Sequence, residues 1–114
     1  IAWMGRLLSR SSIMSTLITV PTPPTSPDDL VLDFWGATAV RDLKDRDGIS
    51  SFFPLSLPAG ELRLAFGVFV DWFTPFKSRN SRHYSVGAVY LVCLNLPPHL
   101  RYKVENICLI GVIP

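Results

Sequence analysis

The sequence predicts a small α/β protein whose main feature is a three-stranded antiparallel meander, preceded by an irregular N-terminal half. Two observations support this expectation. Three apolar segments of strand length follow one another from Glu61 onward, and prolines and turn-forming residues interrupt the chain before that point. The 114 residues suffice for one small domain with a core, and a hydrophobic fraction of 48% is typical of globular chains.

The first part of the chain, residues 1–29, is expected to be an N-terminal segment ending in a linker. Residues 4–17 could form a short helix, although their apolar positions lack a clear helical period. Four prolines within residues 20–27 remove backbone donors and favour extended chain, so we expect residues 18–28 to be irregular and exposed. The chain starts with isoleucine and stops within an apolar run, which we interpret as a fragment of a longer protein.

Residues 30–60 give weaker indications of secondary structure. Residues 30–35 are apolar enough for a short strand or a helical turn. Residues 41–47 alternate in charge sign, which favours a solvated surface, and Asp47-Gly48 is a turn signal. Phe52, Phe53 and the following prolines indicate irregular chain held by aromatic side chains.

The three predicted strands are residues 62–71, 84–96 and 107–113. A period of two in the first places Leu62, Leu64, Phe66, Val68 and Val70 on one face and brings Asp71 to the end of the strand. The second is almost continuously apolar, which is typical of a strand covered on both faces. Connections of about ten residues are short for parallel crossovers, so we expect antiparallel neighbours. The residues predicted to be mostly buried are Leu64, Phe66, Val68, Val89, Leu91, Leu109 and Ile110.

Other classes of protein are not supported. Cys93 and Cys108 lie in apolar runs, where a free thiol behaves as a small hydrophobe, and with two scattered histidines they show no zinc-ligand spacing. No apolar run reaches the roughly 18 residues that a membrane-spanning helix needs.

Asp71 is the candidate catalytic residue. A carboxylate at the end of a strand, followed by a loop, is where two-metal phosphoryl-transfer enzymes hold Mg²⁺. A single aspartate at a strand end or turn is also a common structural feature, and the residue chemistry alone leaves both interpretations open.

The sequence of the second half of the chain resembles the sequences of a known family. The segments are Phe69-Val70-Asp71-Trp72-Phe73-Thr74-Pro75-Phe76, residues 84–103 with the motif Asn95-Leu96-Pro97-Pro98, and a closing Gly111-Val112-Ile113-Pro114. In combination they resemble the transposase domain of CACTA (En/Spm)-type DNA elements, particularly fungal copies. The resemblance covers residues 30–114, which would form part of that catalytic domain.

The resemblance implies a partial ribonuclease H-like fold, in which the first three strands form an antiparallel meander and the first strand carries the first acid of a catalytic triad. Asp71 then becomes that acid and a ligand of Mg²⁺, the cofactor of the complete parent enzyme. The implied activity is DNA strand cleavage and transfer in the nucleus. The other acids would come from the remaining C-terminal part of the catalytic domain, so we expect this fragment to be inactive alone.

Basic side chains in the two connections are candidate DNA contacts: Lys77, Arg79, Arg82, Arg101 and Lys103. Basic loops near an acidic metal site can hold the phosphate backbone, although such charges also serve as ordinary solubilising surface. Trp72 and Phe73 could stack on a flipped base or pack against the sheet. Two further interpretations remain: a non-catalytic nucleic-acid-binding remnant, and a decayed transposon-derived protein without activity.

Overall fold

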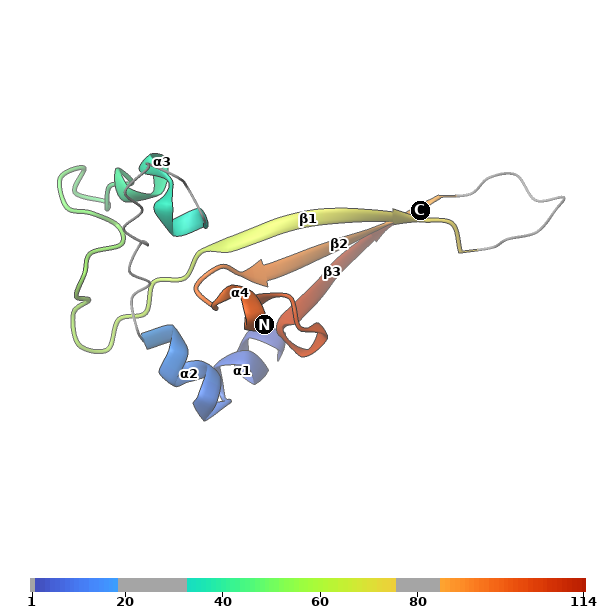
Figure 1. Ribbon diagram of the computed structural model, residues 1–114, viewed down its shortest axis with the longest axis horizontal. Coiled ribbons are helices and arrows are strands. Elements are labelled where there is room, and N and C mark those ends of the chain that lie inside the picture. The colour runs from blue at the N-terminus through green and yellow to red at the C-terminus, as the bar shows by residue number, and fades with distance from the viewer. Residues whose placement is uncertain (1, 19–32, 76–84) are drawn as a thin grey trace, which may run out of the picture. The chain divides into compact units, whose positions relative to one another are not determined.

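The computed structural model describes residues 2–18, 33–75 and 85–114, and these form two compact units, Ala2–Leu64 and Ala65–Pro114. Figure 1 shows the helices and strands of both. The mixture of helices with a three-stranded antiparallel sheet confirms the expected small α/β class. The expected boundary after residue 29 and most of the expected linker, residues 19–28, lie outside the described residues.

The second unit, Ala65–Pro114, contains the sheet. Strands β1 (Phe66–Phe73), β2 (Val86–Cys93) and β3 (Ile107–Ile113) pair antiparallel in the order β1-β2-β3. This confirms the predicted meander, and Figure 1 shows the three strands side by side. The register shifts between Val89 and Tyr90, where β3 contains an irregularity at Ile110. The almost continuous apolar run of residues 84–96 was predicted to form a strand covered on both faces. It contains the central strand, β2.

The first strand starts four residues later than predicted, because its partner ends at Cys93. The chain turns after β2, with the Leu96 N–H donating to the Cys93 carbonyl. Leu94 N–H still donates to the Ala65 carbonyl, but the Ala65 N–H donates to the side-chain Oδ1 of Asn95. Residues 62–64 therefore have no strand to pair with in the described part of the chain, and Asp71 lies within β1 rather than at its end.

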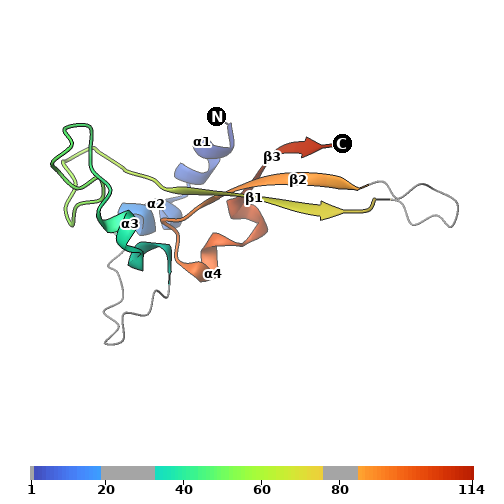
Figure 2. The same ribbon diagram turned by 90° about the horizontal axis from the view of Figure 1, so that it is seen from above.

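Polar side chains organise the connection between β2 and β3. This connection contains α4 (Pro98–Arg101) and η2 (Val104–Asn106), and Pro98 suits the first turn of α4 because it lacks an N–H. Asn106 is buried and its Nδ2 donates to the Leu100 carbonyl at 2.7 Å. Figure 2 shows α4 on one side of the sheet.

The predicted burial was wrong for the outer strands. Val68 is 62% exposed, Leu109 56% and Ile110 52%. The other four residues of that prediction, Leu64, Phe66, Val89 and Leu91, are half-buried. A period of two shows which residues share a face but not whether that face is covered. In this unit the buried side chains lie on the central strand, the turn after it and the connection to β3: Ala88, Val92, Cys93, Asn95, Leu96, Arg101 and Asn106.

The first unit, Ala2–Leu64, begins with two helices in place of the single one expected over residues 4–17. They are α1 (Ala2–Leu8) and α2 (Ser11–Ile18). The break falls at Ser9, whose hydroxyl donates to the Arg6 carbonyl, a bond by which serine competes with helix continuation. Ile13 and Leu17 are buried and lie four residues apart, on one face of α2.

The rest of this unit is short turns held by aromatic rings. Residues 34–36 form the 3₁₀ turn η1 (Phe34–Gly36), whose first N–H bonds to Asp33 Oδ1, followed by α3 (Thr38–Arg41). Trp35 is buried and meets Phe53 edge to face at 4.9 Å between ring centroids, and Phe53 meets Phe52 at 4.8 Å. The expectation of irregular chain held by aromatics is confirmed.

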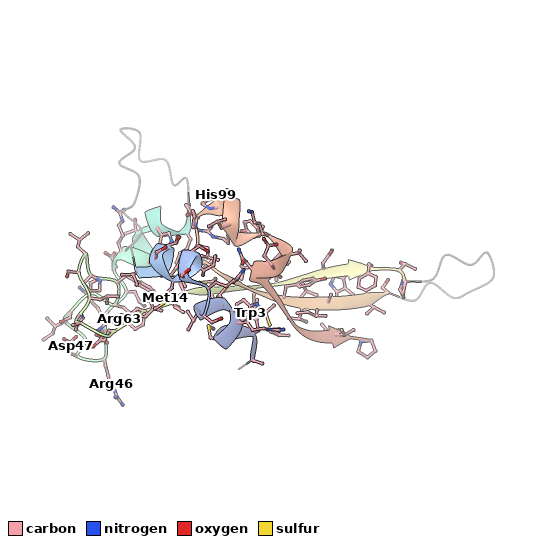
Figure 3. The ribbon with its side chains drawn as sticks, turned by 90° about the horizontal axis from the view of Figure 1, so that it is seen from below. Trp3, Met14, Arg46, Asp47, Arg63 and His99 are labelled. Atoms are coloured by element: carbon pink, nitrogen blue, oxygen red, sulfur yellow. The ribbon has the colours of Figure 1, made fainter. Side chains whose placement is uncertain are left out.

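Arg63 stabilises the charged loop of the first unit, residues 41–47. Its Nη1 lies 2.8 Å from Asp45 Oδ2 and donates to the Phe52 carbonyl, and its Nη2 lies 3.1 Å from Glu61 Oε2. Figure 3 shows Arg63 near Asp47 of this loop, with Arg46 projecting away from it. Residues 41–47 are exposed apart from the half-buried Asp45, as the alternating charges predicted, and Gly48 takes the positive φ of 69° that its turn requires.

Candidate functional site

Asp71 lies near one end of β1. It faces Ala88 of β2, and Ala88 in turn faces Val112 of β3, so the three side chains share one face of the sheet. The neighbours of Asp71 on that face along β1 are Phe69 and Phe73. The Asp71 side chain is exposed. The surface around this carboxylate is therefore mainly apolar.

The aromatic residues around Asp71 lie against the adjacent strand. The Phe69 ring stacks on Tyr90, with 5.1 Å between centroids and 26° between planes. Trp72 is on the opposite face, where its ring covers Gly87: a Cβ built at Gly87 would come within 3.1 Å of it. Trp72 and Phe73 both remain exposed, so neither is enclosed in the core.

The described residues do not by themselves form a magnesium site. Mg²⁺ prefers near-octahedral oxygen coordination, and two-metal sites need several convergent carboxylates. Within the described ranges, no group of three or more His, Cys, Asp or Glu side chains is placed to hold a metal ion. The residues that Asp71 faces across the sheet are alanine and valine, which supply no side-chain ligand.

The five basic residues predicted to contact DNA differ in what the structure says of them, and Arg101 is treated separately below. Lys77, Arg79 and Arg82 lie outside the described residues, so nothing here tests them. Lys103 is exposed and keeps a side chain that a phosphate could reach.

Arg101 has a different environment from the one its position in a basic connection suggested. It is only 4% exposed. Its Nε donates to the Leu96 carbonyl at 3.0 Å, and its Nη2 donates to the Leu94 carbonyl at 2.8 Å. These bonds hold the turn after β2. A buried guanidinium with these partners is not placed to contact a DNA backbone, so Arg101 is not among the proposed DNA contacts.

Sequence reasoning missed the structural pair Asn95 and Arg101. Both residues are of types that are mostly exposed, and only their positions beside Pro97 and Pro98 hinted at a special turn. For Arg101 the available signal was the absence of backbone donors at Pro97 and Pro98, which leaves buried carbonyls nearby for a side chain to satisfy. Nothing local in the sequence indicates that the Asn95 side chain accepts from the Ala65 N–H.

The two thiols are free. Cys93 is fully buried at the end of β2, and this burial raises the pKa of its thiol, whereas Cys108 is half-buried. Among the described residues, no helix is long and apolar enough to cross a membrane.

The fold and the surroundings of Asp71 can also be compared with known proteins. No protein-family model matches the chain, and neither a curated protein nor a solved structure matches it.

Proposed function

We propose that the chain is part of the catalytic domain of a CACTA-type DNA transposase with a ribonuclease H-like fold, in which Asp71 is the first metal-binding acid. One observation carries the proposal: Asp71 lies on the first strand of an antiparallel three-stranded meander, with its side chain exposed. This is the arrangement that the family resemblance implies for the first acid of such a site.

The surroundings of Asp71 support a site completed by other parts of the parent protein. A lone exposed carboxylate binds Mg²⁺ weakly, because the ion keeps most of its water shell unless several oxygen ligands replace it. In the proposed parent, further acids lie close to the exposed Asp71 side chain. The metal ions would there activate the attacking oxygen and stabilise the leaving one.

The proposed partner is DNA, in the nucleus, and the proposed contacts are Lys77, Arg79, Arg82 and Lys103. Contacts of this kind neutralise phosphates without reading bases, so affinity should fall steeply as salt rises. Replacing Lys77, Arg79 and Arg82 together with alanine should weaken DNA binding and reduce its salt dependence. Equal binding by this triple variant would contradict the proposed contacts.

Strand cleavage tests the proposed enzyme. The chain alone, incubated with supercoiled DNA and Mg²⁺ or Mn²⁺, should produce no nicks. A longer polypeptide translated from the surrounding genomic reading frame should nick DNA, and Asp71→Asn should abolish that activity. Asp42→Asn is the matched control, since it removes an exposed carboxylate in the charged loop.

Two outcomes would contradict the proposal. Nicking by the isolated chain that disappears in Asp71→Asn would show a complete site within these residues. Full activity of the longer polypeptide carrying Asp71→Asn would remove Asp71 from the catalytic acids.

A further inference from the structure

Asp47 and Gly48 lie at the tip of a closed loop, residues 44–51 of the first unit. The two ends of this loop form an antiparallel bridge, and the Asp45 N–H donates to the Ser50 carbonyl at 2.8 Å. Gly48 has a φ of 69°, a conformation that residues with a Cβ rarely adopt. Both Asp47 and Gly48 are exposed, so water reaches the pair.

An aspartate followed by a glycine has a modification chemistry of its own. Glycine has no side chain to shield its nitrogen, so the Gly48 nitrogen is able to attack the Cγ of Asp47. The new bond closes a succinimide ring: the nitrogen loses its proton, the carboxyl group loses an oxygen, and a molecule of water leaves. Water then opens the ring. Cleavage between the nitrogen and the original backbone carbonyl gives isoaspartate, whereas cleavage at Cγ restores aspartate.

The attacking nitrogen is held in the closed loop. The Gly48 N–H donates to the Asp45 carbonyl at 2.9 Å. The proton that this nitrogen must lose is therefore engaged in a hydrogen bond, and an attack on the Cγ of Asp47 would break that bond. The closed loop thus opposes the first half of the reaction.

The carboxylate of Asp47 is also held. Its Oδ1 accepts from the N–H groups of Ile49 at 2.8 Å and Ser50 at 2.9 Å, and its Oδ2 accepts from the Ser50 hydroxyl at 2.6 Å. These bonds, with that of the Ser50 hydroxyl foremost, favour the ionised form and lower the pKa of Asp47. An ionised carboxylate reacts slowly with the nitrogen, because an oxygen leaves more readily from the protonated acid. Ring closure is therefore slow while these three bonds last.

Arg63 joins this loop to the rest of the first unit. Its Nη1 lies 2.8 Å from Asp45 Oδ2 and donates to the Phe52 carbonyl at 2.9 Å. It thereby holds Asp45, whose carbonyl accepts from Gly48. Exposed backbone hydrogen bonds are among those that open most readily in a folded protein. Loss of the Arg63 contacts should therefore increase the fraction of chains in which the loop is open.

We propose that Asp47-Gly48 is a latent isomerisation site, which the closed loop protects and which converts to isoaspartate when residues 44–51 open. Isoaspartate directs the backbone through the former side chain and adds a carbon to it. The carboxylate then no longer lies where it accepts from Ile49 and Ser50, so the closed loop does not form again. The proposal is independent of the transposase assignment, because it uses only the contacts of this loop.

The rate of isoaspartate formation tests the protection. The whole chain is incubated at neutral pH and digested with trypsin, and liquid chromatography with mass spectrometry separates the aspartyl and isoaspartyl peptides, which have the same mass. The folded chain should form isoaspartate at Asp47 roughly tenfold or more slowly than the same chain in concentrated urea.

Two variants test the contacts that protect the site. Ser50→Ala removes the hydroxyl bond at an exposed position and should raise the rate in the folded chain roughly threefold, with an unchanged circular dichroism spectrum. Arg63→Gln removes the ion pair with Asp45 and should raise the rate further. Arg41→Ala, an exposed arginine of α3, is the matched control and should leave the rate unchanged. In urea all four chains should react equally fast.

The proposal is wrong if the unfolded chain forms no isoaspartate at Asp47, or if the folded and unfolded chains form it equally fast. Rates in folded Ser50→Ala and Arg63→Gln equal to that of Arg41→Ala would show that these contacts give no protection. Should circular dichroism show that Arg63→Gln is unfolded, Ser50→Ala decides the outcome, because its substitution is exposed and leaves the backbone bonds of the loop in place.

Discussion

Replacing Arg101 with alanine should strongly destabilise the second unit. The guanidinium is buried and donates to the carbonyls of Leu96 and Leu94. Alanine leaves both carbonyls without these donors and removes the side chain that fills the space between them. A buried polar group that loses its hydrogen bond costs about 1–3 kcal/mol, so the loss of these two bonds, one of them only part-buried, costs at most roughly 2–6 kcal/mol.

We expect a loss in the lower half of this range, about 3 kcal/mol, because the turn can relax and admit water to one carbonyl. A loss of about 3 kcal/mol is a large share of the stability of a domain of this size, which is typically about 5–15 kcal/mol. It corresponds to a fall in melting temperature of roughly 12 °C, at about 4 °C for each kcal/mol.

Urea denaturation followed by circular dichroism measures this difference directly. Lys103→Ala is the control: the residue is exposed, close in sequence and also cationic, and its removal should change the free energy of unfolding by less than about 0.5 kcal/mol. Arg101→Lys should recover only part of the loss, since an ammonium lacks the planar guanidinium that reaches two carbonyls at once. Equal stabilities of Arg101→Ala and Lys103→Ala would refute the structural role of Arg101.

Three further predictions concern other parts of the chain. Gly87→Val should push the Trp72 ring off the sheet and shift its indole NMR signal, whereas Gly111→Val, with no atoms within 4 Å of an added Cβ, should leave that signal in place. Bonds from the Ser50 hydroxyl and from two backbone N–H groups lower the pKa of Asp47, so its contribution to stability is present above the unfolded value of about 3.9 and is lost as pH falls through the folded pKa; Asp47→Asn should flatten this acid dependence of unfolding. The burial that raises the pKa of Cys93 should leave this thiol unreactive toward alkylating reagents at neutral pH until the chain is unfolded, and rapid alkylation of Cys93 in the folded chain would contradict its position at the end of β2.

The strands could be predicted because their signal is local. Alternation within 62–71 and the apolar runs at 84–96 and 107–113 depend on neighbouring residues alone, and short connections restricted the pairing to antiparallel. The extent of β1 could not be predicted, because it depends on where β2 ends, some thirty residues later in the chain.

The prediction that Val68, Leu109 and Ile110 are buried was wrong for a related reason. Val68 and Leu109 show the same pattern as residues of a covered strand, and only the position of β1 and β3 at the sheet edges leaves them exposed. Arg101 shows the opposite error, because a cation in a short connection resembles a surface residue until its two carbonyl partners are known. The setting of Asp71 on β1 followed from its sequence position, whereas any further acids around it would depend on residues distant in sequence.

The bonds that Ala65 makes with Leu94 and Asn95 also determine which part of the hairpin can change during evolution. Asn95 accepts from the Ala65 N–H, and the Leu94 N–H donates to the Ala65 carbonyl, so the register of β1 and β2 is fixed at the end opposite to their connection. A slip of one residue would break both bonds and invert the faces of β1. Insertions or deletions between Phe73 and Val86 can therefore accumulate without moving Asp71 from its place opposite Ala88. Homologous chains should differ in length mainly in that connection, and much less between Cys93 and Ile107.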